Sequence, residues 1–594
     1  MIKHGGEKPQ SILLNIMNQF WTNPNDIPDH WLNANVISIY KNKGSKSDPN
    51  NYRSIFLLDT LSKIFAGIIC NRLVQQIDNQ IPPTQFGFRK HLSTSHAITT
   101  IRHIIQCALD SRKTIIIIFV DLTKAFDTLP KQLIQNALSK TCRSRNINLC
   151  MNKLLDDPKG FLANTKLNFF MKRGVKQGSK EGPSLFNLVF KQILEQTIDH
   201  TLKGVELKNQ NNEPWTIKHL EYADDLCILA NNTEEASNSL NELQKYLRTL
   251  NMEISISKTK YMIINKQDNQ SSITIENKQI EEITNFLYLG SIINNKGTAN
   301  DTITHNISKS KNALIKISPI LKSNKLHIST KTSLINTLII PHLTYSLESI
   351  VLRKTDWSRL EAVLNTARRI ILNIKDKKEL NIQQLHEKIR LPNIATKIMQ
   401  NRLNLWYTAN KRPNNIIIKA LTSHIENPTK HRNAHTKSWI RQLNQDIHEM
   451  KNQLPTNWQA QPTKVKITSS NTHHPKIIGQ RDLTHPCQNP NCNRMFATKK
   501  EMNRHYRNDH NTRNTDPIST TSNLKCPLSD CNKSYTTLGW LNRHIKSCHP
   551  QYSQQHIEHN NNTHPKDKKT HNTVHFQDAT KHYQWQKVSL IIAM

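Results

Sequence analysis

The sequence predicts an α+β fold in which a mixed region comes first, a helical region follows, and two small units come last. Residues 1 to about 270 alternate helical patterns with short β-branched runs, which is typical of a mixed domain. From about 315 to 410, segments such as TKTSLINTLIIPHLTYSLESIV carry apolar residues at spacings of three and four, which predicts helices. After residue 480, cysteine and histidine recur in two sets with the same spacing.

The chain is long and strongly basic. Its 594 residues are enough for two or three domains. A formal net charge of +36 and a pI near 9.8 exceed what solubility requires, and a polyanionic partner is the usual reason. Nucleic acid is favoured over an acidic membrane surface, and a plain solvated surface is the alternative.

The cysteine content and the amino terminus argue against a secreted protein. Ten cysteines in so long a chain do not suggest a disulfide scaffold, and MIKHGGEKPQ lacks an apolar signal core. We therefore expect an intracellular protein. The longest purely apolar run, Ile115–Val120, is too short to span a bilayer and predicts a buried strand.

Three aspartates are placed where they could converge. Asp121 directly follows the apolar run, and Asp224 and Asp225 lie between two short apolar runs in HLEYADDLCILA, as in a tight hairpin. Nucleotidyl transfer with two divalent ions roughly 3.5–4 Å apart requires such carboxylates, and magnesium prefers oxygen ligands. A solvated turn is the alternative for Asp224 and Asp225 taken alone.

Several motifs, taken in order, carry a family resemblance. FVDLTKAFD, GVKQGSKEGPSLFN and YADD resemble the three palm motifs of the reverse transcriptases of non-LTR (LINE-like) retrotransposons. YKNKGSKSDPNNYRSIFLL and QFGFRKHLST resemble the finger motifs, while LNMEISISKTKYM and FLYLGSII resemble the motifs beyond the catalytic turn. LIIPHLTYSLESIV resembles the helical thumb. The similarity covers about residues 10 to 410 and implies a right-hand polymerase with fingers, palm and thumb.

The resemblance also implies roles for single residues. Asp121, Asp224 and Asp225 would hold two magnesium or manganese ions. Phe126 would lie under the sugar of the incoming nucleotide and exclude a 2′-hydroxyl, although it could be an ordinary core residue. Lys258 could protonate the leaving pyrophosphate.

Further residues are assigned to the nucleotide by the same resemblance. Lys41 and Arg53 would grip the triphosphate, with a solvated basic face as the alternative for Lys41. Gln177 and Gly178 would lie against nucleotide and template, because glycine lets the backbone approach closely, and Tyr222 is assigned to the same pocket. Asp127 is expected to cap or orient a helix.

The second motif departs from the family at three positions. Lys180, Glu181 and Gly182 precede Pro183, where small or apolar residues and a serine are typical. Reduced activity is therefore a hypothesis that the sequence leaves open.

The two cysteine and histidine sets match ββα zinc fingers. Four, twelve and four residues separate the ligands in each set. The predicted zinc ligands are Cys487, Cys492, His505 and His510 in the first finger and Cys526, Cys531, His544 and His549 in the second finger. Each unit has too little core to persist alone, so zinc should order it. Arg504 and Arg543 are candidate nucleic-acid contacts, although fingers also bind protein.

These patterns give a provisional domain organisation. We expect fingers and palm over residues 1–270, the motif beyond the palm and the thumb over 271–410, a basic linker with at most one helix over 411–480, two fingers over 481–550, and a disordered polar tail over 551–594. No upstream endonuclease, restriction-like nuclease or RNase H motif is apparent.

The leading hypothesis is an enzyme that copies element RNA into DNA. Its expected partners are template RNA, a DNA primer or nicked target DNA, and deoxynucleoside triphosphates, with no membrane partner and with action in the nucleus. A group II intron-type enzyme is one alternative, because it shares the Tyr-Ala-Asp-Asp string. A relic or domesticated protein that binds nucleic acid without copying it is the other.

Overall fold

The computed structural model describes most of the first 450 residues and a few residues beyond. These are 6–450, except 157, 164–166, 210, 268–270, 375, 377–378, 413–414 and 426–438, together with 485–486, 492, 495–496, 503, 524–526, 531, 534–535 and 544. The chain divides into two compact units, Met1–Gln480 and Arg481–Met594. Among the described residues, no helix has the length and apolar character needed to cross a membrane.

A five-stranded sheet lies at the centre of the first unit. Its order is β13 (Glu281–Glu282), β10 (Lys260–Ile264), β3 (Ile115–Val120), β9 (Asp225–Ala230) and β8 (His219–Tyr222). All six residues of β3 are buried, which confirms the predicted buried strand. Ile116, Ile118 and Val120 enter one core and their alternate neighbours enter a second, because successive side chains of a strand point to opposite faces.

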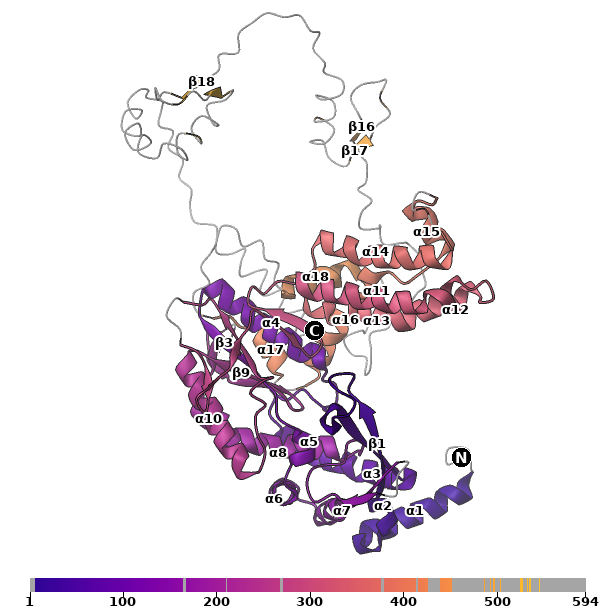
Figure 1. Ribbon diagram of the computed structural model, residues 1–594, viewed down its shortest axis with the longest axis vertical. Helices are drawn as coiled ribbons and strands as arrows, with labels where there is room; N and C mark the ends of the chain where they lie inside the picture. Colours follow the sequence, from indigo (N-terminus) through magenta and orange to yellow (C-terminus); the bar gives the residue numbers. More distant parts are fainter. Residues whose placement is uncertain are drawn as a thin grey trace, which may run out of the picture. The chain divides into compact units, whose positions relative to one another are not determined.

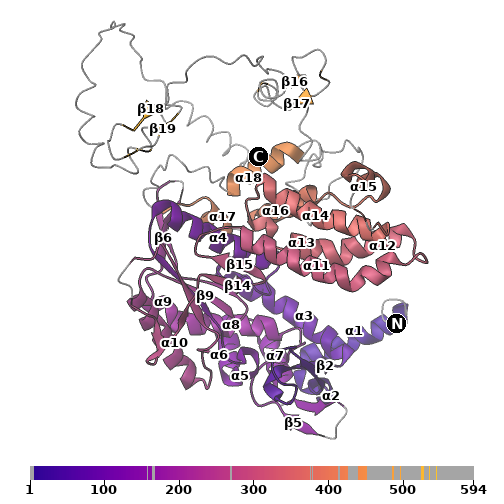
Figure 2. The same ribbon diagram turned by 45° about the horizontal axis from the view of Figure 1, so that its top comes forward.

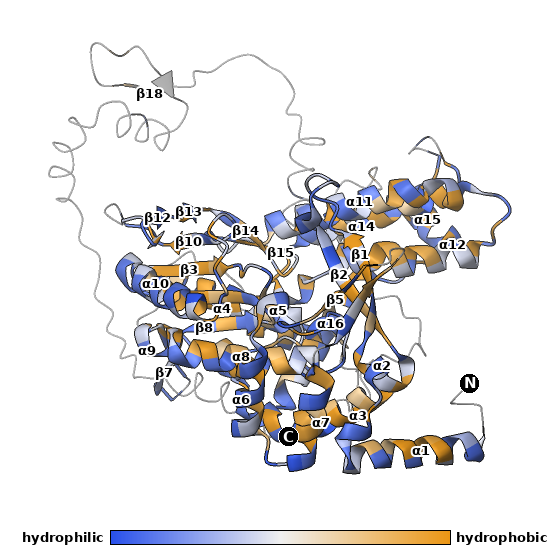
Figure 3. Ribbon diagram, turned by 60° about the horizontal axis from the view of Figure 1, so that its bottom comes forward, coloured by the Kyte–Doolittle hydropathy of each residue, from blue (hydrophilic) through white to orange (hydrophobic). Residues whose placement is uncertain are grey.

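Helices cover both faces of this sheet. One core is formed with α1 (Glu7–Thr22), α3 (Thr60–Ile77), α6 (Lys131–Thr141), α7 (Arg145–Leu155), α8 (Gly182–Gln196) and α10 (Thr233–Thr249). The other is formed with α4 (Thr94–Ser111), α16 (Ile394–Asn410), α17 (Ile416–Leu421) and α18 (Trp439–Met450). Figure 1 shows α4 and α17 on one side of β3 and β9 and α8 and α10 on the other, and Figure 3 shows β3 as strongly hydrophobic.

A second sheet carries the predicted finger motif. Its order is β2 (Tyr52–Leu58), β1 (Ala34–Tyr40), β4 (Lys159–Leu162) and β5 (Asn168–Phe170). Strands β1 and β2 form an antiparallel hairpin whose register pairs Tyr40 with Tyr52. A small core of Ala34, Val36, Phe56 and Met171 lies beneath this sheet.

The region after the central sheet is helical, as predicted. A hairpin of β14 (Asn285–Tyr288) and β15 (Ser291–Asn294) leads into α11 (Asn300–Lys322), α12 (Ile328–Leu334), α13 (Ile340–Thr344), α14 (Lys354–Ile371) and α15 (Ile382–Lys388). Helices α11, α13 and α14, with the π-helical turn after α12 and the start of α16, share a third core, and Leu334 of α12 packs against it. All of these helices and α15 are grouped together in Figure 2. The π-helical turn, Ile335–Ile339, joins α12 to α13 just before Pro341, which cannot donate a backbone hydrogen bond.

The expected linker at 411–480 is partly incorporated into the first unit. Helix α18 includes the anticipated helix around Trp439, and α17 is an additional helix. Trp439, Leu443 and Met450 are buried in the second core together with Ile417, so these residues are not linker. The remainder, 451–480, lies outside the described residues, as do most of the fingers and the tail.

The remaining short elements connect these layers or belong to the second unit. In the first unit they are α2 (Asp29–Leu32), α5 (Ala125–Thr128), α9 (Ile198–Thr201), β6 (Val205–Lys208), β7 (Pro214–Ile217), β11 (Thr274–Ile275) and β12 (Lys278–Gln279). In the second unit, β16 (His485–Pro486) pairs with β17 (Met495–Phe496), and β18 (Leu524–Lys525) pairs with β19 (Ser534–Tyr535).

Candidate active site and metal-binding centres

Strand register brings the predicted aspartates to one edge of the central sheet. In the antiparallel pair β3·β9, Val120 lies opposite Leu226, so the next positions along the two strands are Asp121 and Asp225. On the other side of β3, Lys260 lies opposite Phe119, and the chain just before β10 brings Lys258 beside Asp121. The Lys258 Nζ lies 3.1 Å from Asp121 Oδ2.

The turn between β8 and β9 presents the other carboxylate. Tyr222 pairs with Asp225 across this hairpin, which leaves Ala223 and Asp224 as a two-residue loop. Ala223 has a φ of 58°, in the left-handed region that a residue with a Cβ adopts at a cost of about 1 kcal/mol or more. Because Ala223 is 5% exposed, the surrounding protein must hold the turn in this conformation.

The aspartates repel one another in the absence of a cation. Burial, followed by the charges of Asp224 and Asp121, raises the pKa of Asp225 to about 6. Burial also raises the pKa of Asp224, where the Asp121 charge adds to the effect and the Arg53 charge opposes it. A set of partly exposed carboxylate ligands with excess negative charge fits a divalent cation of the magnesium type.

Phe126 lies in α5, five residues after Asp121. It is half-buried and its ring stacks on Phe186, with centroids 4.4 Å apart. The exposed ring of Phe88 meets it edge-on at 6.2 Å. Phe126 is therefore fixed on one side by the core and free on the other to contact a ligand.

The second motif packs against the finger sheet. The backbone carbonyl of Gln177 accepts a hydrogen bond from the Phe56 amide, 2.8 Å away, and a Cβ on Gly178 would lie 2.9 Å from the Phe56 carbonyl oxygen. Glycine is therefore required by this close approach. The Gln177 side chain donates to Asp127 Oδ1 at 3.1 Å, so Asp127 orients Gln177.

The two basic finger residues occupy different places. Arg53 lies exposed on β2, and its charge acts on Asp224. Lys41 follows β1, donates to the Asn50 carbonyl at 2.9 Å and acts electrostatically on Asp127. Tyr222 is half-buried against the second core at the end of β8.

Two of the three unusual residues of the second motif have internal roles. Glu181 is 3% exposed and offsets the charge of Lys176, which is 5% exposed and donates to the carbonyls of Leu32 and Leu154 at 3.3 and 3.1 Å. Burial lowers the pKa of Lys176, and Glu181 counteracts that shift. Gly182 begins α8, and its amide donates to Ser179 Oγ. Glu181 and Gly182 are therefore buried beneath the site, whereas Lys180 is exposed.

Sequence reasoning missed the residues that hold the turn from behind. Gln85 is fully buried and hydrogen-bonds the backbone of Ala223 and the side chain of Glu221. Thr84 also donates to Glu221, at 3.0 Å. Gln85 belongs to the recognised string QFGFRKHLST, but its contact lies far along the chain, so no local signal identifies its role.

In the second unit, three predicted zinc ligands come together. The donor atoms of Cys526, Cys531 and His544 all lie within 4.8 Å of one another, and Cys531 Sγ is 3.3 Å from His544 Nε2. Two thiols and an imidazole suit zinc. The fourth predicted ligand, His549, lies outside the described residues.

The first finger is described at few positions. Its β16–β17 hairpin and Cys492 are present in the structure, whereas Cys487, His505 and His510 lie outside the described residues. Arg504 and Arg543 lie outside them as well, so their contact with nucleic acid stays a prediction.

Part of the first unit matches a known family. The family described as "Reverse transcriptase (RNA-dependent DNA polymerase)" matches residues 40–293, which include all three aspartates. Residues 40–293 are a reverse transcriptase domain. The family "Zinc finger, C2H2 type" matches residues 524–549, the unit in which the three zinc donors meet. A reverse transcriptase domain implies divalent metal ions, an RNA template, a nucleic-acid primer and deoxynucleotides, and a C2H2 finger implies zinc.

Relatives of this reverse transcriptase domain are polymerases of non-LTR retrotransposons. The RNA-directed DNA polymerase from mobile element jockey of Drosophila melanogaster is 24% identical over 67% of this chain and 44% of its own length. The Pol polyprotein from type-1 retrotransposable element R2 of Popillia japonica is 23% identical over 54% of this chain and 45% of its own. The chain thus spans less than half the length of either relative.

Solved telomerase structures share a weaker similarity with the chain. Telomerase from Candida albicans, in complex with a telomeric RNA fragment, is 12% identical with a TM-score of 0.33, over 60% of this chain and 66% of that one. Telomerase from Candida tropicalis, in a similar complex, is 11% identical with a TM-score of 0.35, over 69% and 62%.

Proposed function

We propose that the protein is the RNA-directed DNA polymerase of a non-LTR retrotransposon, extending a primer 3′-hydroxyl on an RNA template. The convergence of Asp121, Asp224 and Asp225 within the reverse transcriptase domain carries this proposal. The intact carboxylate set favours a catalytic protein over a relic that only binds nucleic acid. The altered second motif does not oppose catalysis, because Glu181 is buried beside Lys176.

Two divalent ions, magnesium or manganese, would be held by the three aspartates and would supply activation of the primer hydroxyl and charge stabilisation at the phosphates. Arg53, exposed on β2 near Asp224, would bind the triphosphate. Lys41 would assist it from the start of the loop between β1 and β2. Lys258 is paired with Asp121 in this structure, and it could donate a proton to pyrophosphate once a cation replaces that contact.

The nucleotide pocket would be shaped by the second motif and by aromatic rings. Phe126 would face the sugar and exclude a 2′-hydroxyl, because its stacking on Phe186 prevents it from moving away. Gln177 and Gly178 would contact nucleotide and template where the backbone approaches β2, and Tyr222 would belong to the same nucleotide pocket.

The zinc-binding units would add affinity for nucleic acid. Each finger would hold one zinc ion, and the basic residues around them would contact phosphates. We propose that Arg504 and Arg543 contribute to this binding and that the protein acts in the nucleus, where a nicked chromosomal primer would be available.

Primer extension on an RNA template tests the proposed function. Wild-type protein is compared with the Asp224→Ala, Asp225→Ala double variant, with magnesium and deoxynucleotides. Extension is expected in the wild type and should fall below detection in the variant, because the metal ligands are lost while the sheet core is unchanged. Equal RNA binding and equal melting curves serve as controls. A folded, zinc-loaded wild type that binds RNA without extending the primer would contradict the proposal.

A further inference from the structure

The catalytic turn depends on a contact from an amide side chain outside the sheet. Gln85 Oε1 accepts from the Ala223 amide at 2.9 Å and from the Gly87 amide at 2.8 Å. Gln85 Nε2 donates to Glu221 Oε2 at 3.1 Å and to the Ala223 carbonyl at 3.4 Å. One side chain thus contacts both backbone polar groups of Ala223, the residue with the left-handed backbone.

These partners fix which end of the Gln85 amide is oxygen. Two backbone N–H groups can only donate, so they must face Oε1, and the Glu221 carboxylate must face Nε2. The Gln85 amide oxygen therefore accepts two hydrogen bonds, and the amide nitrogen donates two. Since Gln85 is 0% exposed, water cannot replace a lost partner without repacking.

The segment around Gln85 is itself held firmly. Thr84 and Phe86 exchange backbone hydrogen bonds with Glu221 along the edge strand β8, at 2.9 and 2.8 Å. A Cβ on Gly87 would lie 2.3 Å from the Ala223 nitrogen, so this segment touches the turn directly. The segment therefore completes the sheet edge at the catalytic hairpin.

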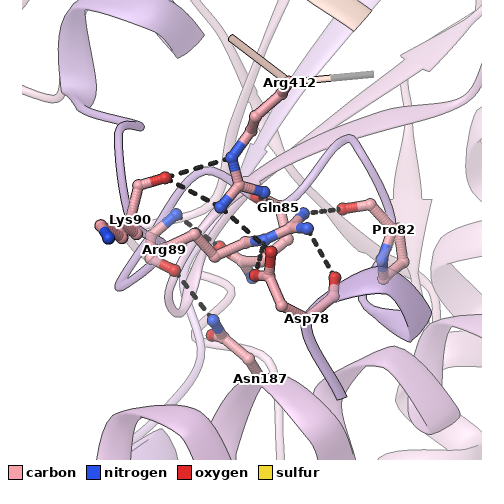
Figure 4. Close-up of polar contacts among 8 residues, drawn as sticks. Asp78, Pro82, Gln85, Arg89, Lys90, Asn187 and Arg412 are labelled. Atoms are coloured by element: carbon pink, nitrogen blue, oxygen red, sulfur yellow. Dashed lines mark hydrogen bonds and ion pairs between the residues drawn. The ribbon is translucent and has the colours of Figure 1, made fainter. Parts of the chain in front are cut away.

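Other elements anchor the same segment (Figure 4). Asn187 on α8 donates to the Gly87 carbonyl at 2.8 Å. The Arg89 guanidinium, nearly buried, bonds Asp78 and the Pro82 carbonyl. Arg412, just after α16, bonds Asp78 and the Lys90 carbonyl. The end of the helical region is thereby tied to the loop that carries Gln85.

Glu221 is held in turn by a buried histidine. His219 Nδ1 lies 3.0 Å from Glu221 Oε1, and its Nε2 lies 3.1 Å from Asp199 Oδ1. Burial lowers the pKa of His219, but the hydrogen bonds and charges of Asp199 and Glu221 outweigh it and raise the pKa to about 9. At neutral pH the imidazolium of His219 is therefore positive, and it faces the Glu221 carboxyl group that accepts from Gln85.

We infer that Gln85, oriented by Glu221, is a positioning residue that sets the conformation of the Ala223–Asp224 turn and hence the place of the Asp224 carboxylate. The expected effect of Gln85 on catalysis rests on the proposed function, whereas its expected effect on the conformation of the turn rests on the geometry alone. Gln85 touches no reacting atom and acts through the backbone of Ala223.

Exchanging the hydrogen-bond donor and acceptor between positions 85 and 221 tests the inference. In Gln85→Glu a carboxylate oxygen faces Glu221. In Glu221→Gln the new amide can accept from Gln85 only by turning its NH2 toward Thr84 and His219, which face a carboxylate oxygen in the wild type and would have to reverse their hydrogen-bonding roles. Each single variant should lower kcat for primer extension by about 100-fold with little change in KM for the template, because catalytic groups are misplaced. In the double variant Gln85→Glu, Glu221→Gln, the new amide donates to the new carboxylate, and kcat should recover at least tenfold over either single variant.

The matched control is Gln106→Glu on α4. Gln106 is partly exposed and donates to Asp110 Oδ1 at 2.7 Å, so the change also places two carboxylates side by side, but away from the turn. Its kcat should equal that of the wild type. Melting curves exclude global unfolding, and Glu221→Gln provides a second single variant if Gln85→Glu does not fold.

Hydrogen–deuterium exchange of the peptide Leu220–Leu226 provides a readout independent of activity. The Ala223 amide should exchange about tenfold faster in the single variants than in the wild type, with protection restored in the double variant. Unchanged exchange and kcat in both folded single variants, or no recovery in the double variant, would overturn the inference. An inactive wild type would contradict the proposed function instead, and the exchange data would still decide the role of Gln85.

Discussion

The palm site, formed by the three aspartates, and the second zinc finger assemble their metal ligands by different means. Asp121 and Asp225 come from distant segments of the chain and meet because β3 and β9 pair within a sheet that is packed on both faces. Cys526, Cys531 and His544 lie close in sequence, on and after a short hairpin. A large core positions the first set before any metal binds, whereas a metal must organise the second. Loss of metal should therefore unfold the second zinc finger but leave the fold around the palm aspartates intact.

Removal of zinc should give the largest structural difference between the palm site and the second zinc finger. In Cys531→Ser, or after chelation, the second zinc finger should lose its ordered structure entirely, because zinc binding supplies its folding free energy. The melting transition of the first unit should not move. Hydrogen exchange resolved by peptide measures both at once, and protection retained around Cys526 in the metal-free protein would contradict the expectation.

A change beneath the palm site should be costly without being fatal. Glu181→Leu removes the charge that offsets buried Lys176, so the free energy of unfolding should fall by about 2–3 kcal/mol. Lys176→Met combined with Glu181→Leu should recover most of that loss, because neither charge is then buried. Denaturant unfolding of the two variants measures the difference. Equal destabilisation by the single and double changes would mean that Glu181 does not compensate Lys176.

The smallest expected effect is on the free energy of unfolding and comes from the carboxyl group of Asp225. Asp225 has a folded-state pKa of about 6 against an ordinary value of 3.8, so its ionised form destabilises the metal-free fold. Stability should decrease as pH rises from about 4 to 6 and stay reduced above it.

Asp225→Asn should remove this pH dependence. The surrounding protein and the neighbouring carboxylates raise the pKa of Asp225, but the residue is still accessible to solvent, which screens the repulsion. We therefore expect a gain of only about 1 kcal/mol at pH 7, with loss of polymerisation. Thermal melts with chelator across this pH range check it, and an unaltered pH profile in the variant would contradict the assignment.

Sequence patterns identified those parts of the site that depend on local order. The β-branched run before Asp121 and the short apolar runs around Asp224 predicted a buried strand and a hairpin, and both are present. Gln85 could not be assigned, because its partners Glu221 and Ala223 are brought to it only by the fold.

The boundary of the first unit was also hard to predict. Helix α18 places Trp439, Leu443 and Met450 in the core at helical spacing, which is a usable signal. Asp446 on the same buried face obscured it, since a carboxylate there requires the partner Arg402. That pairing cannot be recognised from a single segment.

The helices α16 to α18 also affect how the polymerase can be divided. The family match ends at residue 293, yet Ile115, Ile117 and Phe119 on one face of β3 share a core with Leu403, Ile417 and Trp439. A fragment ending at residue 293 would keep α4 on that apolar face but expose the part that α16 to α18 cover, and it should aggregate. Truncations that keep this unit folded are therefore expected to lie beyond Met450, because the family-matched residues and the helices α16 to α18 form one folding unit.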